Sequence, residues 1–172
     1  MTLIGLPMIL PSESDLTYQC VFYLVMYFWE PNEIGMVLEW TEYPSQSFPS
    51  NFYPKKIRSS DLFGGPIHIL EKPFIERFEH LIYMNISYCL MVTEFPDVFG
   101  AVNLRELRLD GCMELVTIHK LVGGLPNLIF LSASECYQLR SFVPTIYLPS
   151  LEYLSFNDCI KLTLPKDKGN DG

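Results

Sequence analysis

Apolar residues recur with a fixed phase in the second half of the chain. Four segments open with Leu at nearly constant intervals of about 23 residues, a spacing typical of repeat proteins, and close with Cys: LIYMNISYC, LRELRLDGC, LIFLSASEC and LEYLSFNDC. Each follows the pattern L-x-x-h-x-h-x-x-C, in which h is apolar. The alternation around positions 4 and 6 predicts a short half-buried β-strand in every segment. The opening residues are Leu81, Leu104, Leu128 and Leu151.

One such unit cannot cover its own apolar face, so neighbouring units must stack on it. The period and the Cys at position 9 fit the leucine-rich repeat template. We therefore predict an α/β fold, a leucine-rich repeat solenoid, with parallel β-strands on the concave face only. Proline between the repeats, as at Pro126 and Pro149, disfavours long helices. The return segments on the convex face are accordingly expected to be irregular, 3₁₀ or short helices.

Stacking predicts two buried columns beside the opening leucines. Burial of a large apolar side chain contributes roughly 1.5–3 kcal/mol, so these columns should dominate stability. Their members are Met84, Leu107, Leu131 and Leu154 at position 4, and Ile86, Leu109, Ala133 and Phe156 at position 6.

The four repeat cysteines could indicate a metal site or disulfides, because they are evenly spaced. Zinc ligands usually come in pairs two to four residues apart, whereas these gaps exceed twenty residues. Side chains in one column also point in parallel, not toward one another. We predict buried free thiols that hold the loop backbone, with no metal and no cofactor, at Cys89, Cys112, Cys136 and Cys159.

Composition narrows the function classes. The chain has 172 residues, 49% of them hydrophobic, and a net charge of −8, which indicates a folded domain and argues against nucleic acid or an anionic membrane as partner. The start lacks the basic residues of a secretory signal. The apolar run Cys20–Trp29 is ten residues long, against about twenty for a membrane span. It predicts a strand or a core helix in a chain that is neither exported nor membrane-spanning.

The sequence offers few candidate catalytic residues. His68, His80 and His119 lie on different segments without a recognisable nucleophile nearby, and paired carboxylates for acid–base chemistry are not identifiable. A formal glycosylation sequon at Asn85 requires a secreted chain and falls on a predicted inner strand. We expect no enzymatic activity.

The stretch from Val37 to Leu164 resembles a specific group of repeats. VLEWTEYPSQSFPSNFYPKK, EKPFIERFEHLIYMNISYC, TEFPDVFGAVNLRELRLDGC and LPNLIFLSASECYQLRSF are similar to the leucine-rich repeat region of plant intracellular immune receptors of the TIR, nucleotide-binding, leucine-rich repeat class, legume type. The resemblance covers about three quarters of the chain. It departs from the family at Gly35, where a repeat usually opens with Leu, and at Ser59 and Ser60, where apolar residues are expected.

The expected organisation has four parts. They are an irregular segment of uncertain origin over 1–33, degenerate repeats over 34–80, four regular repeats over 81–165 and a disordered tail over 166–172. A G-x-x-x-x-G-K-[ST] phosphate loop is absent from the sequence, so the receptors' nucleotide binding and TIR-associated NAD cleavage do not transfer. A fragment of a larger locus, a short gene product and a faulty gene model remain open alternatives.

With positions 4 and 6 inward, positions 3, 5, 7 and 8 should face out on the concave surface. Three aromatics share position 3, the residue mix of interaction hot spots. Alternatively, they merely stack on one another as cross-strand pairs without any ligand. The candidate binding residues are Tyr83, Asn85, Tyr88, Glu106, Arg108, Asp110, Phe130, Ser132, Glu135, Tyr153, Ser155 and Asp158.

By resemblance, the chain is expected to bind protein in plant defence, for recognition or autoinhibition. The partner would be a pathogen effector, a surveyed host protein or the receptor's own nucleotide-binding domain, in the cytoplasm or alternatively the nucleus. One rival interpretation is a non-signalling remnant or scaffold. Another is an extracellular leucine-rich repeat receptor, against which the missing signal and unpaired thiols argue. A truncated solenoid would also be prone to self-association.

Overall fold

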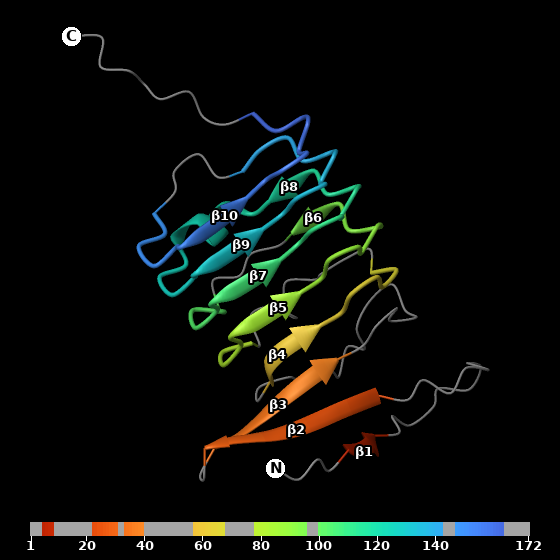
Figure 1. Ribbon diagram of the computed structural model, residues 1–172, viewed down its shortest axis with the longest axis vertical. Coiled ribbons are helices and arrows are strands. Elements are labelled where there is room, and N and C mark those ends of the chain that lie inside the picture. Colours follow the sequence, from red (N-terminus) through yellow and green to blue (C-terminus); the bar gives the residue numbers. More distant parts are fainter. Residues whose placement is uncertain are drawn as a thin grey trace.

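The chain is a solenoid built on one long sheet. The computed structural model describes residues 5–8, 22–30, 33–39, 57–67, 78–95, 100–142 and 147–163. The eight strands of this sheet lie in the order β1-β2-β3-β4-β5-β7-β9-β10, stacked as successive turns (Figure 1). They span Gly5–Met8, Phe22–Glu30, Glu33–Glu39, Ile57–Asp61, Tyr83–Asn85, Glu106–Arg108, Phe130–Ser132 and Tyr153–Ser155.

The regular part of this sheet is parallel, as the repeat pattern predicts. From β3 to β10 each strand pairs with the next in parallel. Equivalent positions lie side by side, so that Tyr83 pairs with Glu106, Glu106 with Phe130, and Phe130 with Tyr153. The leucine-rich repeat fold class is thus confirmed. The nearly constant period keeps these strands in the same register, because each return segment brings the next strand to the equivalent position beside the one before it.

The N-terminal strands pair differently. β1 pairs with β2, and β2 with β3, in antiparallel fashion. β2 contains most of the apolar run Cys20–Trp29, so of the two expected structures the run forms a strand and not a helix. Two strands therefore lie within the segment 1–33 that was expected to be irregular. The expected tail, 166–172, lies outside the described residues.

The convex side corrects one expectation. β6 (Glu94–Phe95) and β8 (Thr117–Ile118) form a second, parallel two-stranded sheet among the return segments, and Thr117 makes an isolated parallel bridge with Ser141. Parallel pairing on the concave face only was therefore wrong. Because the return segments of successive turns are also in register, their backbone groups lie opposite one another and can pair as parallel strands. The 3₁₀ helix η1 (Lys120–Gly124) does match the expected return structure.

The core follows the leucine columns through the middle of the stack. Position 4 and position 6 side chains are fully buried in the repeats that begin at Leu81, Leu104 and Leu128. The last repeat departs from the prediction, since Leu154 is 42% exposed and Phe156 is only partly buried. β10 is the last strand of the sheet, so no described strand stacks on its outer side.

A degenerate repeat precedes the regular four. Ile57 stands one repeat period before Leu81, and β4 pairs with β5 in the same register as the later repeats. Ser60 occupies position 4 there and is fully buried, although its hydroxyl finds no hydrogen-bond partner among the described residues. The backbone thus continues the solenoid even where the side chain departs from the pattern.

Position 8 adopts a left-handed backbone in each described turn from β4 to β10. Its φ angles are 73° at Gly64, 59° at Tyr88, 68° at Gly111, 59° at Glu135 and 60° at Asp158. A residue with a side chain is disfavoured by about 1–2 kcal/mol in this region. At Gly111 space is also short, because a Cβ would lie 2.6 Å from Cδ1 of the Tyr88 ring.

We predict that Gly111→Ala lowers the free energy of unfolding by about 1–2 kcal/mol, since alanine is disfavoured at this φ. Gly124→Ala is the matched control: a Cβ there meets nothing within 4 Å, so stability should be unchanged or slightly higher. Urea denaturation of both variants provides the measurement. Adding Tyr88→Ala to Gly111→Ala removes the ring contact and leaves the backbone cost alone. Equal losses for Gly111→Ala and Gly124→Ala would contradict the assignment.

Candidate functional site

The cysteine column is structural. Each repeat thiol donates a hydrogen bond to the position 6 carbonyl of the preceding turn, and all four repeat cysteines are free. The predicted role, a thiol that holds the loop backbone, is therefore confirmed. The Sγ–O distances are 3.2 Å for Cys89 and Leu62, 3.2 Å for Cys112 and Ile86, 3.1 Å for Cys136 and Leu109, and 2.9 Å for Cys159 and Ala133.

Burial controls the acidity of these thiols. Desolvation raises the pKa of Cys89 to about 11 and that of Cys136 to about 12, and it also raises the pKa of Cys112 and Cys159. A thiolate is the reactive and metal-binding form of cysteine. No group of three or more His, Cys, Asp or Glu side chains within the described part of the chain is arranged to hold a metal ion. The column is thus arranged for packing and hydrogen bonding.

Thiol reactivity should follow this burial. In a Cys20→Ser background, we expect Cys159, the half-buried member, to react first with a disulfide reagent at pH 8, and Cys112 to react last. Mass spectrometry of quenched samples would give the order of labelling. The same protein in denaturant is the control, in which all four thiols should react together. Simultaneous reaction in the folded protein would contradict the buried column.

The same pKa shifts predict a dependence of stability on pH. Below pH 9.0, the ordinary pKa of a thiol, both states are protonated and the stabilisation is complete. Above it the unfolded chain releases protons that the folded chain retains, so the free energy of unfolding should fall as the pH rises toward about 11. Urea titrations from pH 8 to 11 would measure this fall, and Cys89→Ala should make it shallower. An equal fall in both proteins would exclude Cys89 as a source.

The predicted concave residues differ widely in accessibility. Position 5 corrects the prediction most clearly: the short side chains of Asn85, Ser132 and Ser155 are 8%, 4% and 6% exposed. Neighbouring side chains cover them, and their polar groups form hydrogen bonds to side chains of adjacent turns. Tyr88, Tyr153 and Asp158 are exposed. Half-buried are Tyr83, Glu106, Arg108, Asp110, Phe130 and Glu135.

An aromatic and cationic stack occupies the C-terminal half of this face. The rings of Phe130 and Tyr153 are 4.4 Å apart between centroids and inclined by only 4°. The Arg108 guanidinium carbon lies 4.6 Å from the Phe130 centroid, and Arg108 Nε is 2.5 Å from Glu106 Oε1. The cross-strand stacking considered as the alternative is therefore real for this pair. Tyr83 is separated from Phe130 by the intervening β7 strand.

A hydrogen-bonded cluster around one carboxylate, Asp61, joins β4 and β5. Asn85 Nδ2 donates to both carboxylate oxygens of Asp61, at 3.1 and 3.2 Å, and the Tyr83 hydroxyl lies 3.5 Å from the same group. Burial, reinforced by the Asp61 charge, raises the pKa of the Tyr83 phenol. Asp61 was not among the predicted residues. Its signal was its place at position 5 of the degenerate repeat, one repeat period before Asn85.

Asp110 links the next turns. Its Oδ1 accepts hydrogen bonds from the Ser132 hydroxyl and, at 2.8 Å, from the Ser134 backbone N–H. The Ser134 and Ser155 hydroxyls are 2.8 Å apart. A chain of polar contacts therefore crosses three neighbouring turns. It ties together the ends of the strands that carry Arg108, Phe130 and Tyr153.

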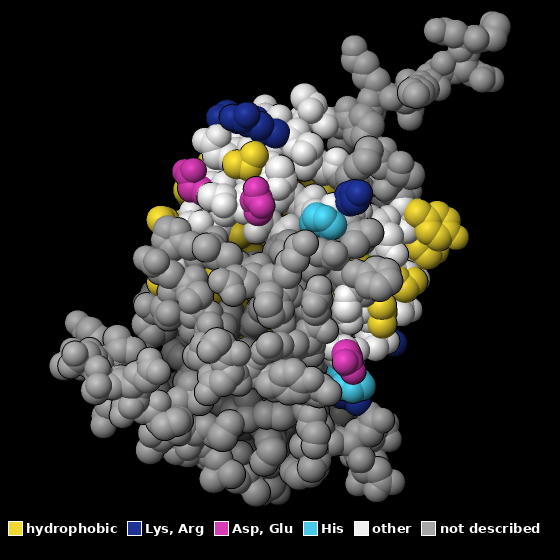
Figure 2. Space-filling model, turned by 180° about the vertical axis from the view of Figure 1, so that it is seen from behind, with side chains coloured by type: hydrophobic (Ala, Val, Ile, Leu, Met, Phe, Trp, Pro, Cys, Tyr) yellow, Lys and Arg dark blue, Asp and Glu magenta, His cyan; other side chains and the backbone are white. Residues whose placement is uncertain are grey.

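A further exposed column was missed. The residue after each cysteine is apolar in all four repeats and between 37% and 78% exposed. The signal was in the sequence, since this position shares the phase of the cysteines. Figure 2 views the molecule from behind the view of Figure 1, and on the described part of that side the hydrophobic side chains lie mainly along the edges. The column consists of Leu90, Met113, Tyr137 and Ile160.

Sequence comparison relates the chain to plant resistance proteins. It is 33% identical over 116 residues to "Protein SUPPRESSOR OF npr1-1, CONSTITUTIVE 1" of Arabidopsis thaliana, covering 67% of this chain and 8% of that protein. Identity is 31% to disease resistance protein RPP4 of Arabidopsis thaliana, over 73% of this chain and 11% of RPP4. It is 30% to TMV resistance protein N of Nicotiana glutinosa, over 71% and 10% respectively.

This chain therefore spans about a tenth of the length of these relatives. No protein-family model matches it. Among solved structures, the leucine-rich repeat domain of the type III effector XCV3220 (XopL) aligns with a TM-score of 0.48 and 24% identity, over 66% of this chain and 36% of that one. The legume type stays a prediction. Within the described residues, no helix has the length and apolar composition that a membrane crossing requires.

Proposed function

We propose, from the homology of this chain to the leucine-rich repeat regions of plant TIR, nucleotide-binding, leucine-rich repeat disease resistance proteins, that it binds a protein partner through its concave face in a defence response. The proposed role is recognition and not catalysis, and it is exercised in the cytoplasm. Free thiols in every regular repeat, held by hydrogen bonds to backbone carbonyls, are consistent with a reducing compartment.

One observation carries this proposal, the stack of Arg108, Phe130 and Tyr153. Tyr and Arg are enriched in the few residues that contribute most of the free energy of binding at protein interfaces. Here they are arranged before any partner arrives, because Glu106 holds Arg108, and the two rings lie face to face. These side chains would therefore lose less conformational entropy on binding a partner than mobile side chains would.

The chain of polar contacts supports the same role. Asp110 and the serine hydroxyls already bond to one another across turns, so they hold the neighbouring strands that carry the stack at a fixed separation. Rigid elements hold a binding constellation more accurately than loops do. We propose a pathogen protein or a surveyed host protein as the partner. Contact with the receptor's own nucleotide-binding domain is the autoinhibitory form of the same interaction.

Proximity labelling in leaf cells, with the tagged chain and with a Phe130→Ala/Tyr153→Ala variant, tests the proposal. We expect specific neighbours of the native chain to lose at least about tenfold in labelling in the variant, since hot-spot truncations cost about 2 kcal/mol or more. Tyr147→Ala is the matched control, because Tyr147 is 74% exposed and lies outside the strands. It should leave labelling unchanged.

Equal protein levels and equal unfolding midpoints must be shown for all three forms. Unchanged labelling in the double variant would overturn the concave site and favour the non-signalling remnant or scaffold.

A further inference from the structure

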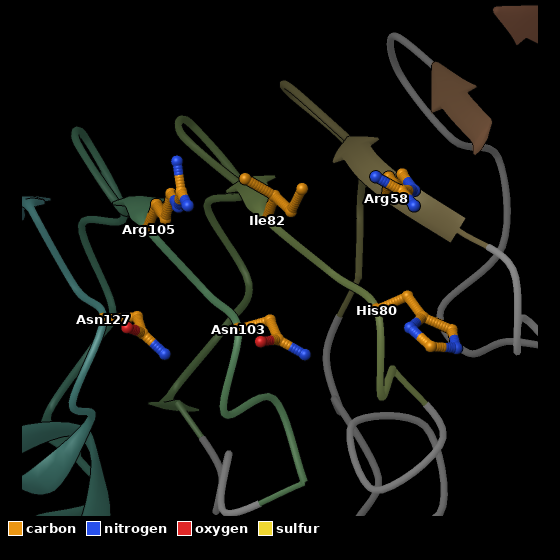
Figure 3. Close-up of a pocket in the computed structure, with 6 residues that line it drawn as sticks. All are labelled: Arg58, His80, Ile82, Asn103, Arg105 and Asn127. Carbon is orange, nitrogen blue, oxygen red and sulfur yellow. The ribbon is translucent and has the colours of Figure 1, made fainter. Parts of the chain in front are cut away.

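A hollow lies away from the concave stack, where the chain enters the strands. It has a volume of about 280 Å³ and is lined by six residues from four consecutive turns. Figure 3 shows them in two rows, one from position 2 of the repeats and one from the position before the opening apolar residue. The lining residues are Arg58, Ile82 and Arg105 in the first row, and His80, Asn103 and Asn127 in the second.

The second row is anchored by its own ladder. Asn103 Nδ2 donates to the Glu79 carbonyl at 2.9 Å, and Asn127 Nδ2 donates to the Val102 carbonyl at 3.0 Å. Each bond joins one turn to the one before it. The amide groups are consequently held at the repeat spacing, which gives the hollow a fixed wall on this side.

The first row carries charge. Arg58 and Arg105 stand at equivalent positions two turns apart, with Ile82 between them, and His80 lies opposite. Among the described residues, no acidic side chain lines the hollow, although the chain as a whole has a net charge of −8. The Arg105 side chain is exposed. A local concentration of cations in an acidic protein favours a ligand with oxyanion groups at this place.

The geometry of the two arginines indicates the kind of anion. Neighbouring strands lie about 4.8 Å apart, so the two backbones are separated by about twice that distance, and alternate side chains of an extended peptide lie about 7 Å apart. A segment that places one carboxylate on the exposed Arg105 therefore carries a second carboxylate toward Arg58, whose positive charge adds to the attraction. Guanidinium groups bind carboxylates in forked, paired hydrogen bonds, and Ile82 between them offers an apolar contact for the segment's backbone or stems.

We propose that this hollow binds a short acidic segment of a protein partner, with one carboxylate on Arg105 and a second one drawn by the charge of Arg58. This site is separate from the concave stack, and the proposal does not depend on the proposed role of that stack. A long polyanion such as a nucleic acid fits less well, because it would extend beyond the hollow onto the acidic remainder of the surface. A short segment with two or three acidic residues stays within the cationic region.

Isothermal titration calorimetry with the full chain and the peptide Glu-Ser-Glu-Ser-Glu-Ser tests this site. We expect binding that weakens with added salt, and no binding of the neutral peptide Gln-Ser-Gln-Ser-Gln-Ser. Arg105→Glu should weaken the affinity at least about tenfold, because it places a like charge against the carboxylates. Arg140→Glu is the matched control. It makes the same charge change at an exposed arginine that does not line the hollow, and the affinity should change less than about twofold.

Inorganic phosphate serves as the second probe. The proposal is overturned if the acidic peptide does not bind, or if Arg140→Glu weakens binding as much as Arg105→Glu, since binding would then follow net charge alone. Binding of phosphate without binding of the peptide would equally overturn it, in favour of a small oxyanion. Competition between the two probes at a site sensitive to Arg105→Glu would support it. The Phe130→Ala/Tyr153→Ala variant should bind the peptide as the native chain does.

Discussion

The constant register between neighbouring turns is the constraint on which this structure depends. Because equivalent positions lie side by side, loop groups of one turn form hydrogen bonds with the turn on either side. The backbone N–H groups of Tyr88, Gly111 and Glu135 donate to the following turn at 2.7, 2.8 and 2.7 Å, and every repeat thiol donates to the preceding one. A shift of one residue would turn the apolar side chains outward and break these bonds together.

The same register explains why left-handed residues with side chains are tolerated. Tyr88, Glu135 and Asp158 all have φ near 60°, a conformation that L-residues with side chains normally avoid. Two of them use the resulting orientation of their N–H to bond the next turn. A local cost is offset by a bond between repeats, so loop geometry belongs to the stack and not to the individual repeat.

The binding surfaces are formed by the repeat positions that the buried columns do not occupy. The buried columns fix the positions of Met84, Leu107 and Leu131, whereas neighbouring positions vary without disturbing them. The two aromatic rings and Arg108 therefore stack on the concave face, while Arg58 and Arg105 line one hollow where the chain enters the strands. Two chemically different surfaces lie on one rigid support, as expected of solenoids that use extended surfaces for recognition.

The sequence alone determined the repeat phase, the parallel sheet, the central columns and the thiol role, because each depends on positions that recur once in every repeat. Tertiary structure decided what depends on neighbours across turns. It buried Asn85, exposed Leu154 at the last strand, paired the return segments and brought Arg58 together with Arg105. Periodicity tells which side chains share a column, but their accessibility depends on the height of adjacent side chains and on whether another turn covers them.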